Sequence, residues 1–179
     1  MDPFATLGLP RRYDMDRGEL EARYRELQKA LHPDRHAGAS ASQRAMNMGK
    51  AVEVNDAYRV LKDDLRRAEA LLVALGGSLA GGGADDAGAA DPEFLMEVME
   101  LREGLGEAKA EKDMTRVREL ADQVGAMQGQ AREALVKAFD AAESGDDAAV
   151  KKAAALVGRL KYFRRFLDEV SVIEEEALG

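Results

Sequence analysis

Apolar side chains recur at steps of three and four along most of this chain, the spacing that places them on one face of an α-helix. The first stripe predicts an amphipathic helix over residues 17–31, capped by Asp16 and ended by Pro33. Its apolar positions are Leu20, Tyr24, Leu27 and Leu31. A polar loop is expected at 36–42, before a second long helix with the stripe Ala51, Val54, Ala57, Tyr58 and Leu61 and a last helix with Leu65, Ala68, Leu71, Leu72 and Leu75. Two antiparallel helices with shorter flanking helices predict a small all-α domain.

A second helical pattern begins at Asp91 and Pro92, an N-cap followed by proline at the first helical position. Asp113 and Asp146 are expected to cap two further helices. The last helix is expected to bury Ala149, Ala153, Leu156, Leu160, Phe163, Leu167 and Val170. These stripes predict an antiparallel three-helix bundle, and no sustained alternation of β-branched residues predicts a strand. The expected fold class is therefore all-α throughout.

The two patterns are separated by the segment GGSLAGGGADDAGAA at residues 76–90. Glycine gives backbone freedom and no side chain to pack, so we interpret residues 76–91 as a linker or long loop between a domain at 1–75 and another at 92–179. The net charge of −8 divides into +1, −3 and −6 over these three parts. An acidic chain binds nucleic acid poorly, and two halves of different charge suggest two different partners.

Composition excludes several kinds of chemistry. Cysteine is absent, which removes disulfides, thiolate metal ligands and a cysteine nucleophile. No apolar run approaches the length of a membrane span, and the first residues lack the character of a signal peptide. We expect a cytoplasmic protein with no cofactor, no bound metal and no membrane partner.

The tripeptide His32, Pro33 and Asp34 lies where the first long helix ends. Alone, it is most simply a turn. Its surroundings favour a functional interpretation over a simple turn. Arg25 and Lys29 fall about 140° and 180° around the helix from Leu20, on a basic face opposite the core. A catalytic histidine or a His/Asp metal site is the rival interpretation. His32 and His36 are the only histidines, both in one loop without a supporting nucleophile, so we do not expect an enzyme.

The first unit resembles a J domain. The resemblance lies in LQKALHPDR at 27–35 and VNDAYRVL at 54–61. It implies that His32, Pro33 and Asp34 dock on an Hsp70-type chaperone and stimulate its ATPase, with Arg25, Lys29 and Arg35 as electrostatic anchors. Glu26 departs from the family pattern, which is often basic there, and this narrows the basic patch.

The first helix of the second unit carries a second apolar stripe outside its core face. Leu95, Met96 and Met99 fall about 100°, 200° and 140° from Phe94, and three acidic residues border them: Glu100, Glu103 and Glu107. Such a stripe is either a wide core face, an edge that packs on the first unit, or a partner surface suited to adaptable methionines. On the last helix, Tyr162 and Phe166 fall opposite the core stripe and are expected to join this surface or meet the first unit.

The whole chain resembles the Hsc20/HscB family of co-chaperones, through FATLGLP at 4–10, RAEALL at 67–72, residues 94–103 and VGRLKYF at 157–163. The resemblance implies that the second unit binds an IscU-type iron–sulfur scaffold and that the first recruits an HscA-type Hsp70. It assigns the scaffold site to Leu95, Met96, Met99, Glu100, Glu103, Glu107 and Tyr162. Two alternatives are a J protein for another client and a structural or oligomerising helical protein with an incidental HPD loop.

Overall fold

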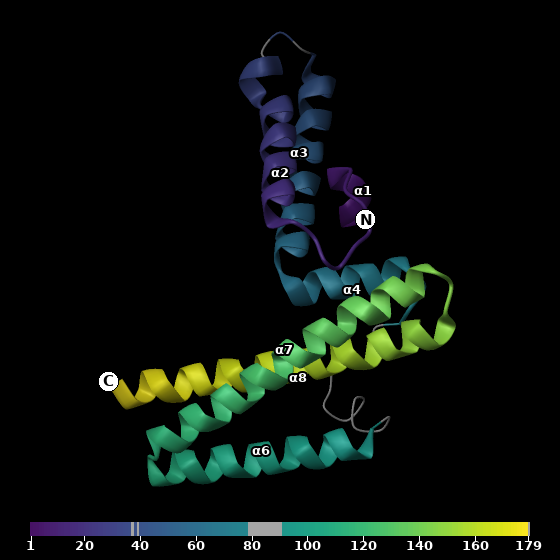
Figure 1. The fold of residues 1–179 in the computed structure, drawn as a ribbon. Helices are drawn as coiled ribbons and strands as arrows, with labels where there is room; N and C mark the ends of the chain where they lie inside the picture. The colour runs from purple at the N-terminus through teal and green to yellow at the C-terminus, as the bar shows by residue number, and fades with distance from the viewer. Residues whose placement is uncertain (37, 39, 79–90, 179) are drawn as a thin grey trace. The chain divides into compact units, whose positions relative to one another are not determined.

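The computed structural model describes residues 1–36, 38, 40–78 and 91–178, and the described part is helical with no strand, which confirms the all-α prediction (Figure 1). The chain separates into two compact units, Met1–Leu75 and Gly76–Gly179. Most of the expected linker at 76–91 lies outside the described residues.

The first unit is a helical hairpin with two short flanking helices. Its elements are α1 (Pro3–Leu7), α2 (Arg17–Leu31), the 3₁₀ helix η1 (Pro33–His36), α3 (Ala41–Lys62) and α4 (Asp64–Ala74). The Asp16 side chain caps α2 by accepting a hydrogen bond from the Glu19 amide at 3.0 Å, as expected. Ser40 caps α3 in the same way, so the last two residues of the expected 36–42 loop belong to that helix.

The core of this unit lies at one end of the hairpin. Its largest fully buried side chains are Phe4, Leu7, Leu20, Leu61, Leu71 and Leu72. The expectation that Leu27 and Leu31 are core residues is wrong, since both are only partly buried. Both lie in the half of α2 nearest the HPD turn, whereas the core residues come from α1, α4 and the opposite ends of α2 and α3. In the middle of the hairpin the Tyr24 and Tyr58 rings stack, with centroids 4.0 Å apart.

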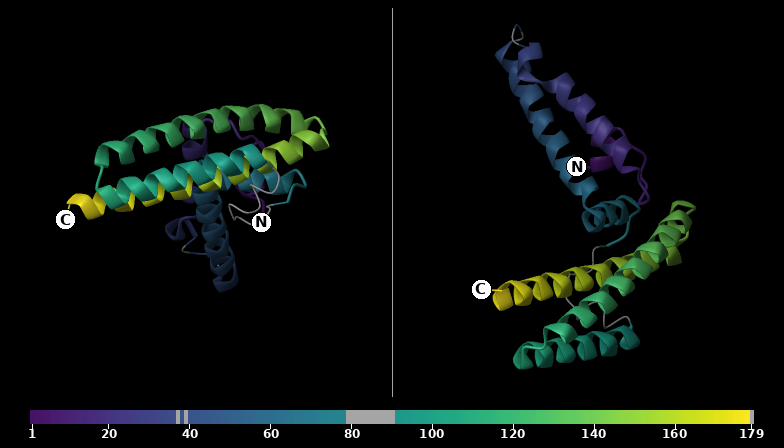
Figure 2. Two further views of the ribbon diagram at one scale, coloured as in Figure 1. Left: turned by 90° about the horizontal axis from the view of Figure 1, so that it is seen from below. Right: turned by 60° about the vertical axis from the view of Figure 1, so that its left-hand side comes forward.

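The second unit is the predicted antiparallel three-helix bundle, formed by α6 (Pro92–Glu111), α7 (Met114–Glu143) and α8 (Asp147–Leu178) (Figures 1 and 2). The expected caps are confirmed, because the carboxylates of Asp91, Asp113 and Asp146 accept amide hydrogen bonds at the starts of α6, α7 and α8. Between α6 and α7 the chain turns through Lys112, which has a left-handed φ of 56°.

The most extensive packing in this unit is between α7 and α8, and α6 packs on both helices. From α6 the core receives Phe94, Val98, Leu101, Leu105 and Ala108. The prediction that Tyr162 and Phe166 lie off the core of α8 is wrong, since their exposed fractions are 2% and 3%. A helix that packs against two neighbours buries a wider arc than one apolar stripe. Tyr162 lies on the side of α8 that contacts α6, and the Phe166 ring lies beside the Tyr162 ring. Leu167, expected in the core, is only partly buried.

Candidate functional site

The HPD turn lies between α2 and α3. His32 ends α2 with an extended backbone, and Pro33 begins η1. The Asp34 amide donates to His32 Nδ1 at 3.3 Å, and the Arg35 amide donates to the His32 carbonyl at 3.1 Å. The side chains of His32 and Asp34 are 59% and 91% exposed, with Nδ1 and Oδ2 3.6 Å apart. Two local hydrogen bonds therefore hold the turn, and it presents an imidazole and a carboxylate to solvent.

Two of the three expected electrostatic anchors, Lys29 and Arg35, lie beside this turn. Lys29, His32 and Arg35 line one open hollow together with Gln28. Arg25 lies one turn further back on α2 and forms an ion pair with Glu21 at 3.1 Å. The structure thus brings the basic side chains of Lys29 and Arg35 to the histidine and keeps Arg25 at the edge of the group.

Gln28 is a member of this group that sequence reasoning missed. Its Nε2 donates to Asn55 Oδ1 at 2.5 Å and to the Tyr24 hydroxyl at 2.8 Å. The Tyr24 hydroxyl also donates to Asn55 Oδ1 at 2.9 Å, which joins α2 to α3. The sequence offers one sign of this role, since Gln28 is a polar residue one helical turn before His32. This network holds the two helices together just behind the HPD turn.

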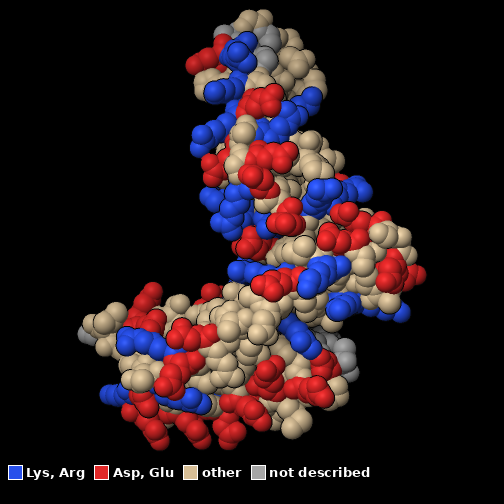
Figure 3. All heavy atoms as spheres, in the orientation of Figure 1, with Lys and Arg blue, Asp and Glu red and all other residues tan. Residues whose placement is uncertain are grey.

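The outer side of α6 carries the exposed apolar stripe that its sequence predicted. Leu95, Met96 and Met99 have exposed fractions of 36%, 64% and 63%. The three acidic residues that border the stripe, Glu100, Glu103 and Glu107, are exposed as well. Acidic side chains gather along the lower edge of Figure 3, where Figure 1 places α6. This surface offers adaptable apolar contact within a negative surround.

Tyr162 does not lie on this surface. Its hydroxyl donates to the Val98 carbonyl at 3.2 Å, and its ring meets the Phe94 ring edge-on, with centroids 5.9 Å apart. Burial raises the pKa of the Tyr162 hydroxyl, an effect that the nearby Arg102 partly offsets. The expected scaffold-contact role of Tyr162 therefore does not match its position, which is beneath α6 and not beside the exposed stripe.

A second unanticipated group lies at the start of α6. Asp91 Oδ1 accepts the Phe94 amide at 3.2 Å, and Asp91 Oδ2 accepts a hydrogen bond from Arg159 on α8. The Arg159 guanidinium also lies over the Phe94 ring, 4.8 Å from its centroid. The Phe94 amide, followed by Arg159, lowers the pKa of the Asp91 carboxyl. One carboxylate thus both caps α6 and ties it to α8.

No group of three or more His, Cys, Asp or Glu side chains in the described part of the chain is placed to hold a metal ion. Among the described helices, none is long and apolar enough to cross a membrane.

Comparison with known proteins identifies both units. Residues 2–70 match the DnaJ domain family, and residues 90–171 match the family described as the HSCB C-terminal oligomerisation domain. Co-chaperone protein HscB homologs from Aliivibrio fischeri (strain MJ11) and Vibrio vulnificus (strain YJ016) are 35% and 36% identical to the chain, with full coverage of both sequences in each case.

Two solved structures share the fold over nearly the whole chain. The chaperone HscB from Vibrio cholerae has a TM-score of 0.78 at 34% identity, covering 98% of this chain and 99% of that one. The human co-chaperone HscB also has a TM-score of 0.78, at 26% identity, covering 96% of this chain and 81% of that one. The chain belongs to the HscB family of J-domain co-chaperones.

Proposed function

We propose that this protein delivers an IscU-type iron–sulfur scaffold to an HscA-type Hsp70 and stimulates the ATPase of that Hsp70, in the cytoplasm. The observation that carries the proposal is the presence, on one chain of the HscB family, of an exposed HPD turn and an exposed apolar stripe on α6. The protein itself makes and breaks no covalent bond in this scheme, so it regulates an ATPase and is not an enzyme.

The HPD turn and its basic neighbours form the proposed Hsp70-docking surface: His32, Pro33, Asp34, Arg25, Lys29 and Arg35. The charged side chains described here are exposed, and exposed ion pairs contribute about 0–1 kcal/mol each. Charges of this kind mostly set the association rate and the choice of partner. We therefore expect a brief, salt-sensitive encounter in which the Hsp70 is engaged and then released.

The outer surface of α6 forms the proposed scaffold-binding surface: Leu95, Met96, Met99, Glu100, Glu103 and Glu107. Exposed apolar side chains give the affinity, because their contact area leaves water on binding. The surrounding carboxylates favour a partner with basic residues around an apolar centre. Tyr162 belongs to the support beneath this surface, since its ring is buried against Phe94.

The Hsp70 half of the proposal is tested with His32→Gln in an ATPase assay with the cognate Hsp70. We expect stimulation to be lost while scaffold binding stays unchanged. Arg12→Gln is the matched control, because Arg12 is exposed and precedes α2 at the end opposite the HPD turn. Full stimulation by His32→Gln would contradict the assignment of this turn and would favour a helical protein with an incidental HPD sequence.

The scaffold half is tested with Met99→Asp in a calorimetric titration against the apo scaffold. A charge at the centre of the stripe must be desolvated on binding, so we expect the affinity to fall at least tenfold, or about 1.4 kcal/mol. Ala126→Asp is the control, since Ala126 is exposed on α7. If the wild type binds no scaffold yet stimulates the Hsp70, the protein serves another client.

A further inference from the structure

The first turns of α6 are joined to α8 by one arginine. The Arg159 guanidinium donates to Asp91, the N-cap of α6, and lies over the ring of Phe94, the first core residue of the helix. Asp91 in turn accepts the Phe94 amide. A single side chain of α8 therefore holds both the cap and the first buried ring of α6.

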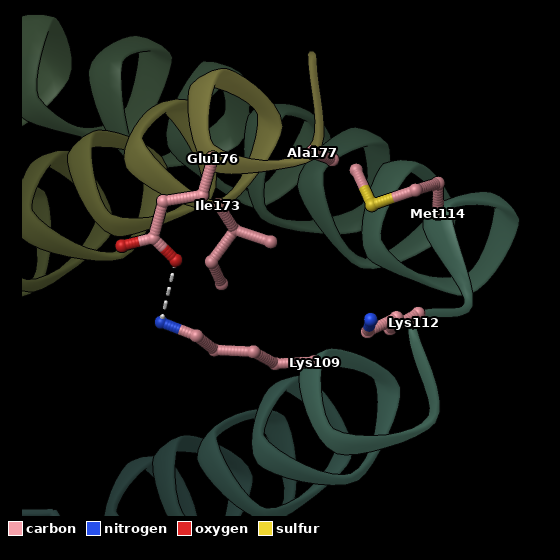
Figure 4. Close-up of a pocket in the computed structure, with 6 residues that line it drawn as sticks. All are labelled: Lys109, Lys112, Met114, Ile173, Glu176 and Ala177. Carbon is pink, nitrogen blue, oxygen red and sulfur yellow. Dashed lines mark ion pairs between the residues drawn. The ribbon is translucent and has the colours of Figure 1, made fainter. Parts of the chain in front are cut away.

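The other end of α6 is joined to α8 more loosely. Lys109 and Glu176 form an ion pair of 3.2 Å, with side chains 50% and 60% exposed. Figure 4 shows this pair across an open hollow of about 480 Å³, which Met114 and Ile173 also line. An exposed pair of this kind contributes about 0–1 kcal/mol. The Arg159–Asp91 pair is itself 36% and 34% exposed, but Arg159 also lies over the Phe94 ring and Asp91 also accepts the Phe94 amide, so the start of α6 has more contacts of this kind than its end.

Orientation matters because the exposed stripe follows this junction directly. Leu95 and Met96 come immediately after Phe94 in the first turns of the helix. Side chains of an α-helix extend about 5–6 Å from its axis, so a rotation of about 30° displaces their ends by about 3 Å. Such a displacement is large enough to spoil the fit of an apolar stripe to a partner.

We infer that Arg159 is a positioning residue for scaffold binding: by holding Asp91 and Phe94 it fixes the rotation of α6 and presents Leu95, Met96 and Met99 in one arrangement. Arg159 acts through α6 and does not contact the scaffold. The inference rests on the proposed function, because it assigns a supporting residue to the same surface.

A double-mutant cycle with Arg159→Gln and Asp91→Asn in the full chain tests the inference. Asparagine is as good an N-cap as aspartate, so the second change removes the ion pair and keeps the start of the helix. Affinity for the apo scaffold is measured by calorimetry, and amide hydrogen exchange of residues 94–99 is measured on the free protein. Lys151→Gln, which removes an exposed lysine near the start of α8, is the matched control.

We expect each single change to weaken scaffold binding about fivefold, the result of lowering the correctly oriented fraction of α6 to about one fifth. The double variant should also bind about fivefold more weakly, because both changes break the same interaction. Exchange at 94–99 should accelerate in all three variants while α7 is unaffected. Arg159→Lys should recover part of the affinity, since a lysine still pairs with Asp91.

Additive losses in the double variant would show that Arg159 and Asp91 affect scaffold binding independently of each other, and would overturn the inference. Unchanged affinity with accelerated exchange would also overturn it and would leave Arg159 a purely structural role. If the wild-type protein binds no scaffold at all, the proposed function fails and the inference fails with it. The wild-type titration therefore separates the two kinds of failure.

Discussion

The buried arginine of the first unit gives the sharpest stability prediction. Arg67 is 6% exposed and makes three hydrogen bonds: Nε to the Tyr13 carbonyl at 2.9 Å, Nη1 to the Leu61 carbonyl at 2.6 Å and Nη2 to Asp64 Oδ1 at 2.8 Å. Its guanidinium also lies 5.3 Å from the Tyr13 ring centroid. The Leu61 carbonyl belongs to the last turn of α3, where helix carbonyls lack intrahelical partners and a cation is favourable.

We predict that Arg67→Ala destabilises the first unit by about 3–5 kcal/mol, because it removes a buried donor from the carbonyls of Tyr13 and Leu61 and breaks a largely buried ion pair with Asp64. Arg67→Lys should lose about half as much, since a lysine cannot bond to three acceptors in a fork. Arg66→Ala, which changes the exposed neighbour on the same helix, should stay within about 0.5 kcal/mol.

Hydrogen exchange under increasing urea measures these values in the full chain, because it follows the amides of α3 and α4 separately from those of α7 and α8. A loss below about 1 kcal/mol for Arg67→Ala would refute the reasoning, since it would mean that water or a neighbouring group replaces the arginine without cost.

Three further predictions concern the second unit. Gly106→Ala should stabilise α6 by about 0.5–1 kcal/mol, because a methyl group there meets open space and removes the entropic cost of glycine; urea denaturation measures the gain. Acidification should loosen the start of α6. The pKa of Asp91 in the folded protein is lowered from 3.8, chiefly by the hydrogen bond from the Phe94 amide. The ionised Asp91 therefore stabilises the fold at a pH above its pKa in the unfolded chain, and this stabilisation is lost as the pH falls through its lower pKa in the folded protein. NMR spectra of the first α6 amides between pH 5 and pH 2 follow this change, and Asp91→Asn should abolish it. Tyr162→Phe should cost about 1 kcal/mol by removing the hydrogen bond to the Val98 carbonyl, with the fold retained in circular dichroism.

Local signals in the sequence predicted most of the helical framework. Asp16, Asp91 and Asp113 each precede a stripe of apolar residues, and each caps the helix that follows. Capping depends on a few consecutive residues, so it is legible without knowledge of the tertiary fold. The exposed Leu95 and Met99 were also predictable, because a helix bundle leaves the side of α6 opposite Phe94 without a neighbour.

The residues that sequence reasoning missed depend on contacts between distant segments. Arg67 is bonded to Tyr13, which lies 54 positions away, and Arg159 is bonded to Asp91, which lies 68 positions away. An arginine in an amphipathic helix is usually exposed, and nothing in its immediate surroundings marks it as buried. Which arginines are buried is decided by how one helix packs on another.

Tyr162 shows how the same limit changes the picture of the partner surface. A helical wheel drawn from one stripe gives α8 a single buried face, but α8 packs against both α7 and α6. Its aromatic residues fill the second face, where Tyr162 meets Phe94 and donates to the Val98 carbonyl. A change at Tyr162 therefore reaches a bound partner through the position of α6. Its effect on affinity should follow its effect on the exchange of α6 amides, whereas a change at the exposed Met99 should alter affinity and leave that exchange unaffected.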